Sequence, residues 1–401
     1  MANYDLPDIK LNKQQSLALP LLIKWWNQRT KPLFQISGLA GTGKTTLIQF
    51  LIREIGLREE EVLFVAYIGK ATLAMSLKGL NASTIHHAIC NTYKKPILDE
   101  HQKPVMANGA PQYTVKFERK EALDPNIKLI VVDEAAMVPE KLADWLMRYK
   151  IPIIALGDLH QLPPIYGKSV FLQKPDVELT EIMRQSDDSP IPYLAKAICE
   201  GKIRFDKRDE YGDKIRIIRR YDRVDYDELF TEPDIILCGT NNHRDKLNNH
   251  IRSYIYKRTQ EYPIIGDKLI CRKNDWSRCI GDNIYLTNGL VGYVEDIHLE
   301  TLHKDSIDID FRPEFIPDDS FDNVTLDRTY LNLPYKFKKE YGGLLNRFEY
   351  GYAITCHLAQ GSEYKHVLID TSDIYFGTKT RVKQWLYTAV TRASEKVTIL
   401  C

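Results

Sequence analysis

The stretch that decides the fold is Gly38-Leu39-Ala40-Gly41-Thr42-Gly43-Lys44-Thr45. A short apolar run, Leu33–Ser37, precedes it, and a helical pattern, Thr46–Ile52, follows it. A strand, a glycine-rich turn and a helix in this order form a phosphate-binding loop (P-loop), because glycine lets backbone N–H groups close around phosphate oxygens at a helix N-terminus. The segment therefore predicts a nucleotide site on an α/β fold.

The side chains of this loop have different expected tasks. We expect Lys44 to reach the β- and γ-phosphates and the Thr45 hydroxyl to ligate Mg²⁺. The residues expected to surround the nucleotide here are Gly38, Gly41, Thr42, Gly43, Lys44, Thr45 and Thr46.

A second acidic site follows the apolar run Ile130–Val132, where Asp133 and Glu134 stand side by side. We expect Asp133 to hold Mg²⁺ together with Thr45, and Glu134 to act as the base that activates the attacking water. An Asp-Glu pair can also simply begin a helix. Beside a P-loop, however, the pair predicts hydrolysis of a nucleoside triphosphate.

A third polar loop, Gly157–Pro164, follows another apolar run. Open α/β sheets bind ligands at the ends of their strands, so this loop should border the nucleotide. Gln161 can donate a hydrogen bond to the γ-phosphate or to the attacking water and is our further candidate catalytic residue.

Strand and helix patterns alternate through the chain, which predicts parallel sheets covered on both faces. The expected strands are Leu33–Ser37, Val62–Ala66, Leu129–Val132, Ile151–Leu156, Ile235–Cys238, Val367–Ile369 and Val397–Leu400. We predict two α/β lobes, 1–90 with 127–183 and 184–279 with 347–401. Each lobe carries an inserted module, which is hairpin-like at 91–126 and β-rich (SH3-like) at 280–346.

Composition narrows the class of protein. The 401 residues include 55 Lys and Arg against 54 Asp and Glu, so a nucleic-acid surface must be a local patch. Seven scattered cysteines favour a reducing compartment. We expect no membrane segment and no export signal. The run Tyr335–Lys339 interleaves aromatic and basic residues and is a candidate nucleic-acid patch.

The ordered motifs resemble the superfamily-one helicases, specifically the 5′→3′ class that includes RecD and the phage helicase Dda. They are Leu11–Ala18, Gly38–Thr45, Ala66–Ala71, Ala82–His86, Asp133-Glu134, Gly157–Pro164, Leu179–Gln185, Thr240-Asn241 with Leu247-Asn248, Tyr352–Glu363 and Tyr387–Ala393. The resemblance implies two RecA-like P-loop lobes that clamp ATP and Mg²⁺ and move along single-stranded DNA.

The resemblance also implies roles for residues beyond the P-loop. Gln15 would read the adenine edge, and Gly361 and Glu363 would lie near the nucleotide. Arg184 and Arg392 would reach the γ-phosphate as arginine fingers.

Further motif residues would face DNA by the same resemblance. These are Tyr67, Lys70, Thr84, His86, Thr240, Asn241, Thr355 and His357. Leu358 stands where the family usually has lysine, so one expected cation is missing.

The prediction is an ATP-dependent 5′→3′ DNA helicase that acts on single strands and on junctions of single- and double-stranded DNA. We expect a monomer in the cytoplasm of a bacterial cell, or of the host if phage-encoded, with single-strand-binding, replication or recombination proteins as partners. Two alternatives stay open: a translocase that remodels protein–DNA complexes without processive unwinding, and a regulatory P-loop switch. RNA also stays open as a track.

Overall fold

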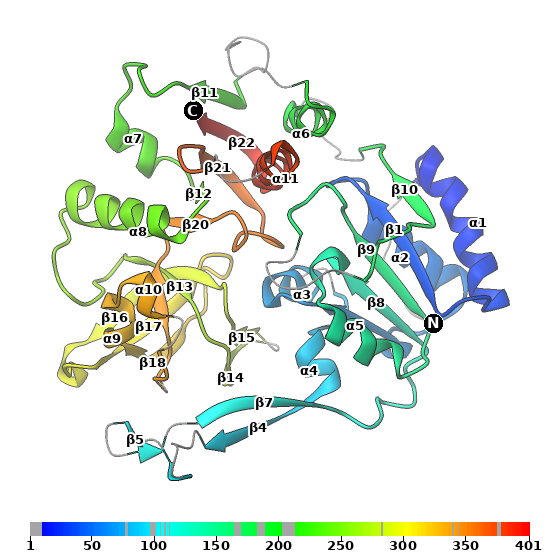
Figure 1. Cartoon of the computed structure of the whole chain (residues 1–401), viewed down its shortest axis with the longest axis horizontal. Helices are drawn as coiled ribbons and strands as arrows, with labels where there is room; N and C mark the ends of the chain where they lie inside the picture. The colour runs from blue at the N-terminus through cyan, green and yellow to red at the C-terminus, as the bar shows by residue number, and fades with distance from the viewer. Residues whose placement is uncertain are drawn as a thin grey trace. The chain divides into compact units, whose positions relative to one another are not determined.

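The computed structural model describes residues 10–401, apart from gaps at 77–78, 97–101, 105, 108–109, 112, 164–169, 183–188, 203–212, 282–283, 339–340, 344 and 375–377. The chain divides into two compact units (Figure 1). Unit 1 comprises Met1–Asn91, Phe117–Arg204 and Thr378–Thr391, and unit 2 comprises Thr92–Lys116, Phe205–Gly377 and Arg392–Cys401. No helix in the described part of the chain has the length and apolar character needed to cross a bilayer.

Unit 1 is built on a parallel six-stranded sheet in the order β10-β1-β9-β8-β2-β3. The strands are β1 (Leu33–Gly38), β2 (Val62–Ala66), β3 (Ala82–Thr84), β8 (Leu129–Asp133), β9 (Ile153–Gly157) and β10 (Val177–Leu179). The four strands expected in this lobe are confirmed. β9 starts two residues later than expected, after Pro152, which has no N–H to donate to a neighbouring strand.

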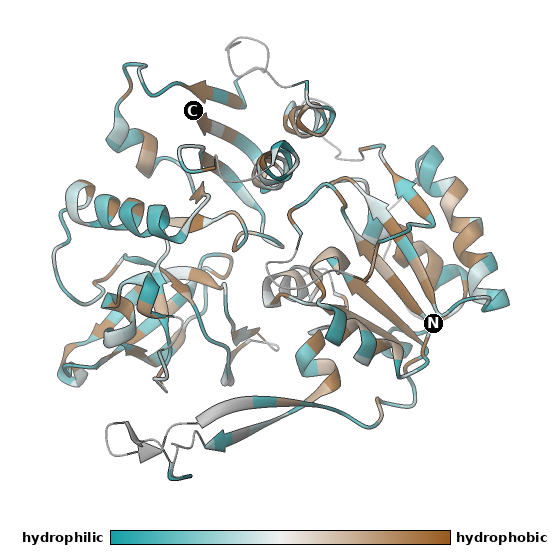
Figure 2. Ribbon diagram, viewed as in Figure 1, coloured by the Kyte–Doolittle hydropathy of each residue, from teal (hydrophilic) through white to brown (hydrophobic). Residues whose placement is uncertain are grey.

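The residues of this sheet alternate between two cores, one on each face. Phe64 and Val131 belong to the first core, and their neighbours Val65 and Val132 belong to the second. Successive side chains on a strand point to opposite faces, so a strand buried on both sides is apolar throughout. Figure 2 shows β8 largely in the hydrophobic colour.

Helices and short turns complete unit 1. They are α1 (Lys13–Gln28), α2 (Lys44–Glu54), η1 (Glu59–Glu61), α3 (Gly69–Ser76), α4 (Ile85–Ile89), η2 (Ala135–Met137), α5 (Glu140–Met147), α6 (Ile191–Glu200) and α11 (Lys379–Val390). We expected α11 in the second lobe. The structure groups it with unit 1, where it packs against α6 and bonds to the loop after β9.

The structure contains the predicted hairpin, but it groups Thr92–Lys116 with unit 2 and not with the first lobe, where we expected these residues. β4 (Cys90–Pro96) pairs with β7 (Tyr113–Arg119), and the short strands β5 (Met106–Ala107) and β6 (Ala110–Pro111) pair with each other. β4 begins directly after α4, so the hairpin follows the last strand-and-helix element before β8.

Unit 2 contains a second parallel sheet, in the order β11-β22-β21-β12-β20. Its strands are β11 (Ile215–Ile218), β12 (Ile235–Cys238), β20 (Ala353–Thr355), β21 (Tyr364–Asp370) and β22 (Ala393–Leu400). The helices α7 (Tyr226–Thr231) and α8 (Asn241–His250) and the π-turn η3 (Ile251–Ile255) belong to it. Two parallel sheets with helices confirm the predicted α/β fold class.

The β-rich module of unit 2 is an antiparallel sheet in the order β18-β17-β16-β13-β19. Its elements are β13 (Lys268–Cys271), β14 (Asp275–Ile280), β15 (Ile284–Leu286), β16 (Val291–His298), η4 (Leu299–Thr301), β17 (Ser306–Pro313), β18 (Phe321–Asp327), α9 (Arg328–Asn332), α10 (Tyr335–Lys338) and β19 (Phe348–Tyr350). The module is longer at both ends than the expected 280–346, because β13 pairs with both β16 and β19.

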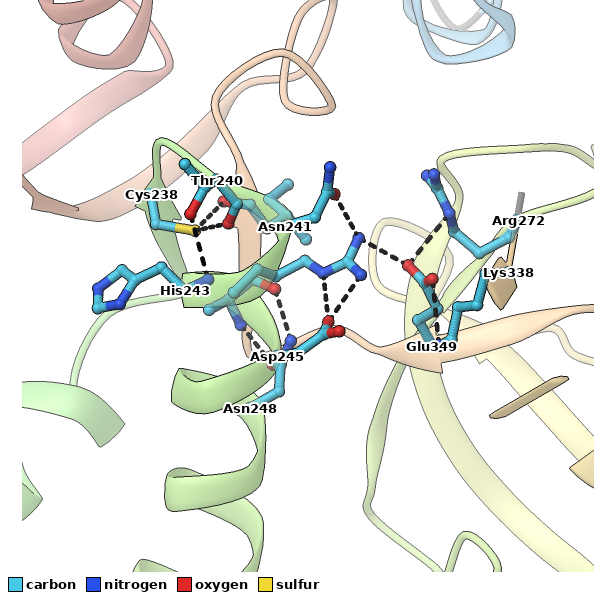
Figure 3. A network of polar contacts seen from close by, with 12 residues as sticks. Cys238, Thr240, Asn241, His243, Asp245, Asn248, Arg272, Lys338 and Glu349 are labelled. Atoms are coloured by element: carbon cyan, nitrogen blue, oxygen red, sulfur yellow. Dashed lines mark hydrogen bonds and ion pairs between the residues drawn. The ribbon is translucent and has the colours of Figure 1, made fainter. Parts of the chain in front are cut away.

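Buried ions join this module to the parallel sheet of unit 2 (Figure 3). Arg244 of α8 is fully buried and forms ion pairs with Glu349 of β19 (2.8 Å) and with Asp245 (2.7 Å). Glu349 also pairs with Arg272 (3.2 Å) and with Lys338 (3.3 Å). Three cations share one buried carboxylate, and together they hold the pKa of Glu349 below its usual value against the opposing effect of burial.

We predict that Glu349→Ala lowers the free energy of unfolding by about 3–5 kcal/mol, because it leaves buried cations without their shared anion. Urea denaturation followed by circular dichroism measures this. Glu395→Ala is the control, since Glu395 is exposed and pairs only at 3.8 Å with the exposed Lys365. Equal stability of the two variants would contradict a structural task for the network.

Candidate nucleotide site and nucleic-acid surface

The P-loop runs from the end of β1 to the start of α2, and its backbone requires glycine. Gly41 and Gly43 have φ angles of 78° and 70°, which side-chain-bearing L-residues rarely adopt. A Cβ at Gly38 would lie 2.8 Å from Thr42 Oγ1 and 3.0 Å from the carbonyl oxygen of Leu179. The loop therefore curls tightly ahead of the α2 N-terminus, which is the arrangement that binds phosphate.

Lys44 lies within this curl. Its Nζ donates to the carbonyl oxygens of Gly38 (2.8 Å) and Leu39 (3.1 Å). Two neutral acceptors thus hold the ammonium group within the loop, and neither of them compensates its positive charge. Thr45 and Thr46 follow in the first turn of α2.

Gln15 is buried directly against the P-loop. Its Nε2 donates to the carbonyl oxygens of Thr42 (3.1 Å) and Gly43 (3.2 Å), and its Oε1 accepts the N–H of Asn12 (3.0 Å). The carboxamide therefore supports the loop in this structure. Its expected contact with an adenine edge would require exchange of these bonds and stays a prediction.

The two predicted carboxylates stand at the carboxyl end of β8. Asp133 ends the strand, and its Oδ1 accepts the N–H of Glu134 (2.9 Å). Glu134 has φ 47°, a left-handed conformation that is rare for a residue with a side chain. Such strain is stored where the fold must aim a functional side chain, so it supports the expected task of Glu134.

β9 lies between β1 and β8, so the loop after β9 falls between the P-loop and the carboxylates. Asp158 in this loop is buried, and its Oδ1 accepts the N–H of His160 (2.9 Å). Gln161 is also buried, and its Oε1 finds no hydrogen-bond partner among the described residues. A buried acceptor without a partner is costly unless a ligand or water satisfies it. Gln161 is therefore suited to contact a group bound at this edge.

Sequence reasoning missed Tyr387, which connects two loops of this site. Its buried hydroxyl accepts the N–H of Ala40 in the P-loop (3.0 Å) and donates to Asp158 Oδ2. The next residue, Thr388, accepts the N–H of Leu162 (2.9 Å). Burial, together with the Asp158 carboxylate, raises the pKa of Tyr387, so the phenol stays protonated and can donate.

The unit 2 residues expected near nucleotide gather at the amino ends of β21 and β22. Gly361 has φ 74°, Glu363 immediately precedes β21, and Arg392 immediately precedes β22. Arg392 is buried, and its Nη1 donates to the carbonyl oxygen of Ser362 (3.2 Å). Arg184 lies outside the described residues. The arginine-finger tasks of Arg184 and Arg392 stay predictions.

The residues of unit 1 fit a nucleotide. The tight P-loop offers backbone donors, Lys44 offers a cation, and the unpartnered Gln161 oxygen offers an acceptor. Thr45 and Asp133 supply the oxygen ligands that Mg²⁺ prefers. Bound Mg·ATP would bring the scissile phosphoryl group and the cation that offsets its charge.

Three aromatic rings form a row at the edge of unit 1. The ring of His86 lies 5.9 Å from that of Tyr67 and 4.7 Å from that of Phe117. Burial lowers the pKa of His86, so the imidazole is neutral at neutral pH and can stack. Phe117 is exposed and lies on β7 of the hairpin. The sequence signal that could have identified Phe117 is its position between two charged residues, Lys116 and Glu118, which indicates a strand face that is open to solvent.

Several other residues expected to face DNA have internal tasks in the structure. Thr84 caps α4 by accepting the N–H of His87, and Thr240 caps α8 and donates to Asp373. Asn241 Oδ1 accepts from Arg244 (3.0 Å; Figure 3). These hydroxyl and amide groups already form hydrogen bonds within the protein, so direct DNA contact by these side chains stays a prediction.

The remaining DNA candidates differ in accessibility. Thr355 is buried at the end of β20, whereas His357 is half-buried in the turn that follows. The Lys70 side chain lies outside the described residues. The expected patch Tyr335–Lys339 needs correction, because Lys338 is buried against Glu349. Residues 335–337 are exposed, and Lys339 lies outside the described residues.

Comparison with known proteins agrees with this geometry. A family model described as an AAA domain matches residues 10–222, which is more than half of the chain, and a UvrD-like helicase C-terminal domain model matches residues 350–400. The protein R530 of Acanthamoeba polyphaga mimivirus is 24% identical, over 96% of this chain and 99% of its own length.

The ATP-dependent DNA helicase Dda of Enterobacteria phage T4 is 30% identical over 59% of this chain, and the match spans only 56% of Dda. The crystal structure of Bacteroides Pif1 bound to single-stranded DNA has a TM-score of 0.57 at 17% identity, and the match covers 98% of this chain and 92% of that one. At this identity the likeness concerns the fold. The chain belongs to the AAA domain family and, as its motifs indicated, to the superfamily-one helicases of the RecD/Dda-like class.

Proposed function

We propose that this protein is an ATP-dependent DNA helicase that moves 5′→3′ along single-stranded DNA and unwinds duplex DNA. One observation carries the proposal: in unit 1 the carboxyl ends of the strands of one sheet bear both the groups for nucleotide hydrolysis and the aromatic rings for DNA binding. The carboxyl ends of β1, β9 and β8 bear the P-loop, Gln161 and the Asp133-Glu134 pair. The carboxyl ends of β2 and β3 lead into Tyr67 and His86 of the aromatic row.

The expected chemistry of hydrolysis follows from these positions. Lys44 stabilises the negative charge on the transferred phosphoryl group, and Thr45 and Asp133 hold the metal that accompanies the nucleotide. Glu134 takes a proton from the attacking water, and Gln161 orients that water. As an arginine finger, Arg392 would add positive charge at the γ-phosphate, a task that rests on the resemblance to the superfamily-one helicases.

DNA that binds at the same end of the sheet can couple strand binding to ATP hydrolysis. Bases stack on aromatic faces without regard to sequence, which a translocating motor needs. Tyr387 and Thr388 link α11 to the P-loop and to the Gln161 loop, so a change at the nucleotide is transmitted to α11. Arg392 follows two residues after the end of that helix.

The β4–β7 hairpin favours unwinding over translocation alone, because two paired strands can serve as the wedge that splits a duplex. The direction of movement rests on the helicase class to which the chain belongs. We further propose a monomer that acts on single strands and junctions with single-strand-binding, replication or recombination proteins. All seven cysteines are free thiols, which supports the cytoplasm of a bacterial or host cell as its place of action.

We predict that the protein unwinds a duplex with a 5′ single-stranded tail and leaves a duplex with a 3′ tail intact. The Glu134→Gln variant should bind ATP and DNA. It should unwind neither of the two duplexes, because it lacks the base for hydrolysis. Strand displacement of fluorescently labelled duplexes measures both. Equal unwinding from 3′ tails would contradict the direction, and rapid unwinding by Glu134→Gln would remove Glu134 from catalysis.

We predict that Phe117→Ala weakens binding of a labelled dT oligonucleotide, because each stacked base contributes about 1–3 kcal/mol. Fluorescence anisotropy gives the affinity. Tyr193→Ala is the matched control, since Tyr193 is an exposed aromatic residue on α6, away from the row. Unchanged affinity in Phe117→Ala, or an equal loss in Tyr193→Ala, would remove the aromatic row from the DNA track.

A further inference from the structure

Unit 2 contains a cavity of about 380 Å³ that is lined by none of the residues proposed to take part in ATP hydrolysis. It lies between α7 and α8, at the carboxyl ends of β21 and β22. The unit 2 residues expected near ATP, Glu363 and Arg392, stand at the opposite, amino ends of these strands. The cavity is therefore distinct from the ATP-facing residues of its own sheet.

The cavity lies where a parallel sheet favours a ligand. β12 and β21 are neighbours, but the chain continues from β12 to β20 on one side and from β21 to β22 on the other. Connections that leave adjacent strands in opposite directions open a crevice at their carboxyl ends, and open α/β sheets bind ligands there. Asp370, which ends β21, and His243, which lies on the helix after β12, both line the cavity.

The polar lining carries more potential positive than negative charge. Asp370 is only 2% exposed, and it pairs with His243 (2.7 Å) and Arg220 (3.0 Å) and accepts the N–H of Ser372 (2.9 Å). The hydrogen bond between Asp370 and His243 raises the pKa of His243 and favours the cationic form of the imidazole. The carboxylate is thus already satisfied.

Two further basic groups line the same cavity from α8. Lys246 lies one turn beyond His243, and His250 lies one turn beyond Lys246, and both are exposed. With Arg220 they leave a surplus of positive charge for an anion.

The rest of the lining is apolar and aromatic. Leu247 and Leu400 are buried, and the rings of Tyr226 and Phe230 lie 6.1 Å apart. A flat apolar group can lie on this surface while an anion contacts the basic rim. Neither an inorganic ion nor a purely apolar ligand would use both parts, and the volume suits a small molecule.

We propose that this cavity, the switch-point pocket, binds a nucleoside phosphate unit. Its phosphate would contact Arg220 and Lys246, and its base would lie against Phe230 and Leu247. The unit can be a free nucleotide or a nucleotide of a DNA strand. Only the second source rests on the proposed helicase function, and no residue of the pocket belongs to the hydrolysis machinery.

Calorimetric titration of the full chain with dTMP tests the proposal, with the ATP site first saturated with Mg²⁺ and the non-hydrolysable analogue AMP-PNP. We expect saturable binding of dTMP that Lys246→Ala weakens about tenfold, since a hydrogen bond to a charged group is lost. Lys304→Ala is the control, because Lys304 is 78% exposed and lies in the antiparallel module. Its affinity for dTMP should match that of the unmodified protein.

Competition separates the two sources. A dT oligonucleotide that displaces dTMP, and whose own binding weakens in Lys246→Ala, assigns the pocket to a DNA strand; failure to displace dTMP assigns it to a free nucleotide. Absence of dTMP binding, equal affinities in the two lysine variants, or inorganic phosphate binding as tightly as dTMP would each overturn the proposal. Basal ATP hydrolysis, measured without DNA, does not involve the pocket, so Lys246→Ala should keep it, and failure of the pocket proposal is distinguishable from failure of the helicase function.

Discussion

The convergence of parallel strands at one edge is the constraint on which the rest of unit 1 depends. Strands that run the same way bring their carboxyl ends together, so loops that are distant in sequence meet there. In this chain the P-loop, the Asp133-Glu134 pair and Gln161 meet at that edge because β9 inserts between β1 and β8. The strained backbone of Glu134 persists because the buried strand that precedes it and the turn that follows it fix its position.

In unit 2, buried charged side chains connect the antiparallel module to the parallel sheet. Arg244 and Glu349 lie in the centre of a network that connects α8 to the antiparallel module, and Asp267 forms a second centre with Arg252 and Arg258. Buried ion pairs contribute little net stability, but a partner without its counter-ion is costly. The network therefore favours a single arrangement of the module on the sheet. A module fixed in this way would move with its sheet when the nucleotide state changes.

Local patterns predicted much of this structure, because a P-loop and a buried strand are each encoded by consecutive residues. The main strands of both sheets were placed correctly for that reason. The hairpin was expected in the right part of the sequence, but its residues Thr92–Lys116 group with unit 2 and not with the first lobe. The ends of the β-rich module were wrong because β13 and β19 belong to it only through pairing with strands far away in sequence.

Side-chain partners were harder to predict than strands. The bond from Tyr387 to Asp158 spans 229 residues, and nothing in the local sequence indicates it. Lys338 was expected in a nucleic-acid patch because a sequence displays charge but not burial. In the structure Lys338 is buried and pairs with Glu349.

The central claim is that nucleotide chemistry and strand binding are coupled at one sheet edge. The most direct test is the rate of ATP hydrolysis by the unmodified protein as single-stranded dT oligonucleotide is added. The account predicts a slow basal rate that rises severalfold and saturates as the DNA site fills. A rate that is independent of DNA across the range in which the oligonucleotide binds would contradict it.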